Sequence, residues 1–165
     1  MYTRIEDFAE EWEKEARLTQ DVLNVLTDES LSQPIAPGRR TLGRLAWHLV
    51  SSVQYMAALG LEFEGVKDER RGPDTAAEIA AEYRRLAAAL QQAVETQWND
   101  DSLRESRAIM GEEWENGASL RFTILHQAHH RGQLTVLMRQ AGLRPPGVYG
   151  PTYEDWEEKG VTPLS

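Results

Sequence analysis

The stretch 125-LHQAHHRGQL-134 holds three of the four histidines of this 165-residue chain. In a helix, at about 100° per residue, His126 and His130 lie one turn apart on the same face, whereas His129 points about 60° to the other side of His126. The fourth histidine, His48, lies upstream in 44-RLAWHLV-50, which also has a helical pattern. If the two helices are neighbours, His48, His126 and His130 can converge on one metal ion and leave a coordination position open.

Four segments of about 20 residues have an amphipathic pattern, in which apolar residues recur every three or four positions with charged residues between them. We expect helices at residues 4–27, 41–60, 75–98 and 119–141, with loops at residues 28–38 and 61–73. Four such helices in a chain of this length predict an all-α fold, a four-helix bundle.

Local signals mark the ends of these helices. Thr41 is expected to cap the second helix, and Asp74 or Thr75 to start the third, with Glu78 three residues after Thr75 in capping-box spacing. Ser119 is expected to cap the fourth helix, and Gly142 to end it.

Residues 100–118, between the third and fourth helices, have the least regular pattern. Residues 106–110 are compatible with a short strand, and Gly111, Asn116 and Gly117 mark turns. An irregular or short hairpin-like segment is therefore expected before the fourth helix.

The segment 144–165 is rich in proline and glycine and contains Tyr149, Tyr153 and Trp156. Proline disfavours helix propagation, so this tail is expected to be extended and to pack through its aromatic side chains on the bundle formed by residues 1–143.

The fourth helix is expected to present different residues to the core and to water. Its apolar face is predicted to consist of Phe122, Leu125, Leu134, Val136 and Leu137. Its solvent-exposed face is predicted to contain Arg131, Thr135 and Arg139.

Composition excludes several classes of function. The net charge of −9 disfavours nucleic acid or an anionic membrane as the main partner, because both attract basic patches. The chain has no cysteine, which excludes disulfides, thiolate zinc sites and a cysteine nucleophile. No apolar run approaches the roughly 18 residues of a membrane span, and the charged first 15 residues contain no signal-peptide core. The expected location is the cytoplasm.

The histidines also have a simpler interpretation, in which they are ordinary core residues of a bundle without metal. Against this, His126 and His130 share a face with Leu134 and Leu137, where an imidazole without a partner is costly. A zincin protease site, His-Glu-x-x-His, is excluded because Gln127 stands where the general base is required and cannot take up a proton at neutral pH.

Two blocks, 42-LGRLAWHL-49 and the run His126-x-x-x-His130-Arg-Gly-Gln-Leu, resemble the DinB/YfiT-like family of proposed metalloenzymes. The resemblance extends from the first helix to Gly142. It implies an up-down bundle, usually dimeric, in which one histidine of the second helix and two of the fourth hold a divalent metal. In this sequence those ligands are His48, His126 and His130.

Other residues of the two blocks have both structural and functional interpretations. Gln133, about 20° from His126 on the helix, is a candidate to hold a ligand histidine or a bound water. Ser52 and Tyr55, beside His48, are candidates to contact substrate and are otherwise residues of a helix face.

Three further residues of the fourth helix are expected to have roles outside metal binding. His129 does not match a ligand position of the family and is expected to pack, to face a dimer partner or to line the rim of the pocket. Arg131 is expected to be an ion-pair partner and Gly132 to permit close helix packing.

Three neutral imidazoles suit zinc, nickel or iron(II) and leave room for water or substrate. Such a site can polarise a carbonyl or lower the pKa of a bound water or thiol, so a metal-dependent hydrolase or transferase acting on a small molecule is expected. The resemblance further implies a thiol-dependent S-transferase or isomerase that uses a low-molecular-weight thiol. The alternative is a non-catalytic, stress-associated bundle that uses its metal structurally or senses a ligand.

Overall fold

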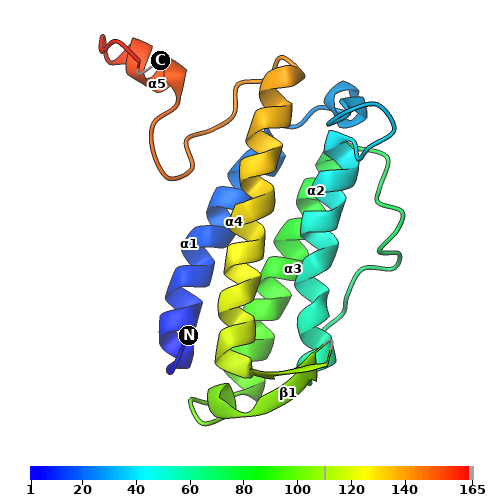
Figure 1. Cartoon of the computed structure of the whole chain (residues 1–165), viewed down its shortest axis with the longest axis vertical. Coiled ribbons are helices and arrows are strands. Elements are labelled where there is room, and N and C mark those ends of the chain that lie inside the picture. The colour runs from blue at the N-terminus through cyan, green and yellow to red at the C-terminus, as the bar shows by residue number, and fades with distance from the viewer. Residues whose placement is uncertain (110, 164–165) are drawn as a thin grey trace.

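The structure is a computed structural model that describes residues 1–109 and 111–163. Four long helices lie side by side, with the short sheet at one end of the bundle (Figure 1). They are α1 (Ile5–Asn24), α2 (Leu42–Ser51), α3 (Ala76–Gln97) and α4 (Asn116–Gln140). The predicted all-α four-helix bundle is confirmed.

The helices of the bundle run up, down, down and up, so the alternation expected of an up-down bundle is interrupted between α2 and α3, which share one direction. Trp12 Nε1 donates to the carbonyl of Ala87 at 3.0 Å and Gln20 Nε2 to that of Ala80 at 3.1 Å, so α1 and α3 are antiparallel. α4 contacts both α1 and α2, and it ascends beside α1 in Figure 1. The segment 60–75 joins α2 to α3 by running along the bundle, which lets these two helices share one direction.

The predicted caps of the second and third helices are confirmed. Thr41 accepts a hydrogen bond from the backbone N–H of Arg44, and Thr75 from that of Glu78. α2 changes after Ser51 into a 3-10 helix, η2 (Ser52–Leu59). The hydroxyl of Ser52 donates to the carbonyl of Leu49 at 2.8 Å, and such side-chain bonds back to the helix compete with its regular ladder.

A two-stranded antiparallel hairpin, β1 (Ser106–Ile109) and β2 (Glu112–Glu115), precedes α4. It confirms the expected hairpin-like segment, of which Met110 lies outside the described residues. Gly111 has a φ of +87°, as the turn requires.

The predicted start of the fourth helix at Ser119 is wrong, because α4 begins at Asn116. The backbone N–H of Asn116 bonds to the carbonyl of Glu105 at 2.9 Å, and its side-chain amide donates to that of Ser102, also at 2.9 Å. These contacts are made by the segment before α4, and they fix the first residue of the helix without a local cap.

The tail contains a helix that was not expected, α5 (Tyr153–Glu158). A capping box between Thr152 and Asp155 starts it, and Arg139 of α4 forms an ion pair with Glu154. In Figure 1, α5 stands away from the end of the bundle. Within the described residues, no helix is long and apolar enough to cross a membrane.

Candidate metal centre

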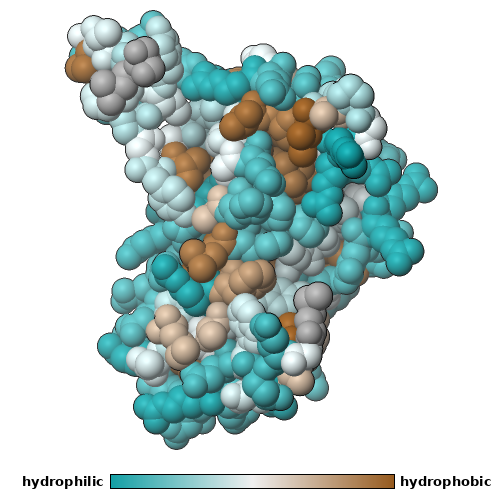
Figure 2. Space-filling model, viewed as in Figure 1, coloured by the Kyte–Doolittle hydropathy of each residue, from teal (hydrophilic) through white to brown (hydrophobic). Residues whose placement is uncertain are grey.

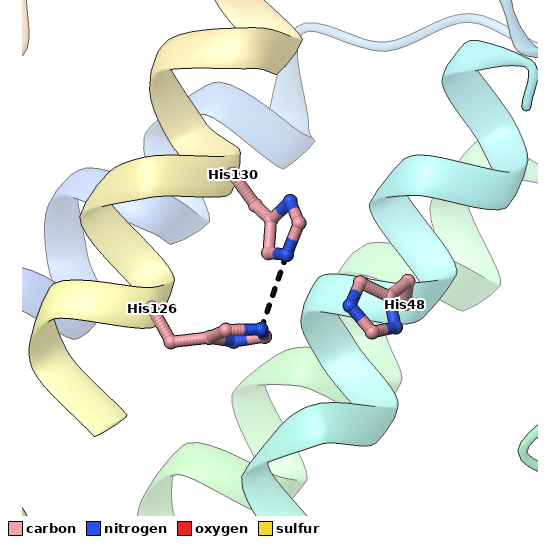
Figure 3. Close-up of side chains that lie close together, drawn as sticks. All are labelled: His48, His126 and His130. Carbon is pink, nitrogen blue, oxygen red and sulfur yellow. Dashed lines mark hydrogen bonds between the residues drawn. The ribbon is translucent and has the colours of Figure 1, made fainter. Parts of the chain in front are cut away.

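His48 of α2 and His126 and His130 of α4, here called the histidine trio, meet between the two helices. Each offers one ring nitrogen, and these nitrogens all lie within 4.8 Å of one another. The Nε2 atoms of His126 and His130 are 3.1 Å apart. Figure 3 shows the three rings pointing toward a common space from the two facing helices. Among the described residues, this is the one group of histidine, aspartate or glutamate side chains that could hold a metal ion.

Gln127 fixes α4 against α2 beside the trio. Its side chain is buried, and its amide nitrogen donates to the carbonyl of Leu49 at 3.0 Å and faces the hydroxyl of Ser52 at 3.5 Å. Since Leu49 follows His48 directly, this bond sets the distance between the two helices at the level of the trio. The sequence excluded Gln127 as a general base but did not reveal this role.

Gln133 orients the ring of His130. Its side-chain oxygen lies 2.8 Å from His130 Nδ1, and its amide nitrogen lies 3.1 Å from His129 Nε2. Because an amide oxygen can only accept, this contact favours the tautomer of His130 that carries its proton on Nδ1 and directs the Nε2 lone pair toward His126. This contact restrains the orientation of the His130 ring.

Burial disfavours the charged form of each histidine of the trio. It lowers the pKa of His48, of His130 and of His126, the last to about 4, because the charged imidazolium loses hydration. Neighbouring histidines lower these pKa values further, as does the positive charge of Arg40 from the segment before α2. A neutral imidazole is the form that binds a metal.

The hydroxyls of Ser52 and Tyr55 join η2 to α4. Tyr55 donates to the carbonyl of Ser119 at 3.0 Å and accepts from Thr123 at 3.4 Å. Ser52 bonds to Leu49 and faces Gln127, as described above. Both side chains are half-buried, and both hydroxyls form hydrogen bonds with other groups of the protein.

The predicted solvent exposure of Arg131 is wrong, although its predicted ion pair is present. Its side chain is fully buried and pairs with the carboxylate of Glu15 on α1. It also donates to the Glu15 carbonyl at 3.0 Å and to the hydroxyl of Thr19 at 2.8 Å. One position along the helix is about 100° of rotation, so Arg131 faces α1 while His130 faces α2.

The predicted apolar face of α4 is only partly correct. Leu134 and Leu137 are buried, but Phe122, Leu125 and Val136 are 41%, 52% and 58% exposed. On the face drawn in Figure 2, hydrophobic patches over α4 interrupt a largely hydrophilic surface. The buried face of α4 is instead of mixed polarity and includes Gln127 and Arg131.

Gly132 does not permit close helix packing, since an added Cβ would meet nothing within 4 Å. His129 is exposed, and its ring centroid lies 4.8 Å from that of His130. It therefore lies at the rim of the trio.

The fold and this group of residues together define an all-helical bundle in which three histidines from the second and fourth helices could hold a metal ion. The chain belongs to the DinB family, whose model matches residues 1–161 and so includes most of the tail.

Two similar proteins come from Bacillus species. The chain is 44% identical over 162 residues to YrdA of Bacillus subtilis (strain 168), which covers 98% of this chain and 97% of YrdA. It is 47% identical to a DinB-like protein of Bacillus cereus ATCC 10987, whose crystal structure covers 90% of this chain and 100% of its own, with a TM-score of 0.87.

A more distant crystal structure shares the fold. YjoA, a DinB-like protein of Bacillus subtilis, is 14% identical and has a TM-score of 0.68, covering 88% of this chain and 99% of its own. At this identity the likeness concerns the bundle alone.

Proposed function

We propose that the chain binds a divalent metal ion through His48, His126 and His130 and uses it to act on a small molecule. The observation that carries the proposal is the convergence of three ring nitrogens within 4.8 Å of one another. Zinc or nickel suits such a shell best, and iron(II) is compatible with it.

The expected chemistry is activation of a bound water or thiol. A divalent ion held by neutral imidazoles keeps its charge and lowers the pKa of a water or thiol that binds it. The positive charge of Arg40 acts on the same rings and favours an anionic ligand there. The family resemblance makes a thiol-dependent S-transferase or isomerase the first reaction class to test, and metal-dependent hydrolysis is the second.

Metal content of the purified protein tests the site. With protein purified without chelators or a nickel column, we expect a stoichiometric divalent metal in the wild type and in His129→Ala. We expect His48→Ala to weaken binding by more than about 100-fold, beyond the 10- to 100-fold typical of residues that only support a ligand. The control is well matched, because His129 is exposed and outside the trio. Equal metal content in all three proteins would refute the site.

Activity assays distinguish a metal-dependent enzyme from a protein that only binds the metal. Wild type and His48→Ala are assayed for conjugation of low-molecular-weight thiols to electrophiles and for hydrolysis of activated esters and amides. Turnover that depends on His48 supports the catalytic role. A metal-loaded protein without turnover supports the alternative, a non-catalytic bundle that uses its metal structurally or senses a ligand.

We also propose that the chain functions as a homodimer. The proposal rests on the family resemblance, and exposed apolar side chains such as Leu125 and Val136 are compatible with it. Light scattering of the purified protein should give twice the mass of one chain.

A further inference from the structure

Three aromatic side chains from separate elements form a surface next to the histidine trio. They are Tyr55 of η2, Trp114 of β2 and Phe122 of α4, here called the aromatic ledge. The ring centroid of Phe122 lies 5.5 Å from that of Trp114 and 6.2 Å from that of Tyr55, with nearly perpendicular planes. These are favourable edge-to-face arrangements.

The ledge is in contact with the trio through Phe122 and His126. Their ring centroids are 5.7 Å apart and their planes are inclined by 31°. Because His126 and Phe122 are one turn apart on α4, the phenyl ring adjoins the imidazole of a proposed metal ligand. Any small molecule that coordinates the metal therefore has the ledge within reach of its substituents.

Hydrogen bonds restrain two of the three side chains of the ledge, although part of it is exposed to solvent. The hydroxyl of Tyr55 is bonded to the carbonyl of Ser119 at 3.0 Å, and Trp114 Nε1 donates to Glu112 at 3.1 Å. Phe122 nevertheless remains 41% exposed, while Tyr55 and Trp114 are half-buried. Rings that are fixed before a ligand arrives lose little entropy on binding.

We propose that the aromatic ledge is a binding subsite for a flat apolar group, and that the protein selects small molecules in which such a group is attached to the metal-coordinating atoms. This inference rests on the proposed metal centre and adds the class of substituent that the site accepts. A substituent placed on the ledge covers the exposed part of Phe122, which gives the site its preference for aromatic over small ligands.

Two hydroxamates that differ only in this substituent test the proposal. The protein is loaded with cobalt(II), and its visible absorption is followed during titration with acetohydroxamate or benzohydroxamate. We expect benzohydroxamate to bind about tenfold more tightly, in the range of an aromatic pair. Phe122→Ala should remove this preference while acetohydroxamate affinity stays unchanged.

Val136→Ala is the matched control, because Val136 is an exposed apolar residue of the same helix and is 58% exposed. It should keep the wild-type preference. Circular dichroism and light scattering of each variant report its helix content and its mass in solution.

Each other outcome overturns a defined part of the proposal. A protein that takes up no cobalt refutes the metal centre and the ledge together. Bound cobalt with equal affinity for both hydroxamates, or with a preference that survives in Phe122→Ala, refutes the ledge alone. Bound cobalt that responds to neither hydroxamate shows that no ligand reaches the site, which also refutes the ledge. A loss of dimer mass in Phe122→Ala with unchanged hydroxamate preference assigns the ring to contact with a second copy.

Discussion

At the residue scale, the neutral amide of Gln133 decides which nitrogen of His130 faces the other two histidines. Its oxygen accepts from His130 Nδ1 at 2.8 Å, while its nitrogen lies against His129. A carboxylate can replace the accepting oxygen but not the donating nitrogen. Replacing Gln133 by glutamate therefore keeps the contact with His130 and removes the contact with His129.

We expect Gln133→Ala to lower metal affinity about 10- to 100-fold, as is typical for loss of a group that orients a ligand histidine. Gln133→Glu should restore the affinity, because it keeps an acceptor for His130 Nδ1. His129→Ala should leave affinity unchanged, which shows that the second contact is not needed. Competition with a chromogenic chelator measures all three. Equal losses in Gln133→Ala and Gln133→Glu would contradict the orienting role.

The site was only partly predictable from single residues. Helical spacing and the scarcity of histidine pointed to His126 and His130, with His48 on a second helix as the third member, and the family resemblance named the same three residues as ligands. Gln127 could not be recognised as a buried link, because its partner is the carbonyl of Leu49, 78 positions earlier in the chain.

At the element scale, local sequence signals predicted where α2 and α3 begin. Features of α4 that depend on contacts with distant segments were not predicted. Thr41 and Thr75 cap their helices through residues three positions away, which the sequence displays directly. α4 begins at Asn116 because the segment near Glu105 and Ser102 contacts it. The buried face of α4 was predicted incompletely for the same reason, because hydropathy assigns a charged residue such as Arg131 to the surface.

Two glycines of α4 have opposite surroundings, which gives a matched pair of substitutions. An added Cβ at Gly117 would lie 2.4 Å from the carbonyl oxygen of Tyr2, whereas one at Gly132 would meet nothing within 4 Å. We expect Gly117→Ala to destabilise the fold by about 1–3 kcal/mol through overpacking. Gly132→Ala should stabilise it by about 0.5–1 kcal/mol through helix propensity.

Urea unfolding followed by circular dichroism measures both effects. Destabilisation of similar size by the two substitutions would contradict the described surroundings of Gly132. A neutral effect of Gly117→Ala would show that the N-terminal segment does not pack on α4 as described.

At the scale of the whole molecule, one buried ion pair joins α1, α4 and the tail. The hydroxyl of Tyr149 donates to the Glu15 carboxylate at 2.7 Å, and its ring centroid lies 5.1 Å from Arg131 Cζ. The side chain of Arg131 is fully buried and that of Glu15 is 11% exposed. Tyr149 is itself 69% exposed, so the tail contacts the buried ion pair through the hydroxyl of this residue before α5 begins.

We expect Glu15→Ala to destabilise the protein by about 3–5 kcal/mol, because it leaves the Arg131 charge buried without its partner. Arg121→Ala removes the ion pair with Glu11, which joins the same two helices but whose side chains are 42% and 37% exposed, and should cost within about 1 kcal/mol. Chemical unfolding of both variants gives the comparison. Equal and small losses would mean that Arg131 reaches water when Glu15 is absent.

The position of Arg131 directly after His130 has a consequence for how α4 can turn about its own axis. The guanidinium is enclosed by α1 while the preceding imidazole faces α2, so a rotation of the helix that improves one contact pulls the other out of alignment. The orientation of His126 and His130 relative to α2 is thus set in part by a buried guanidinium that is not one of the three ring donors.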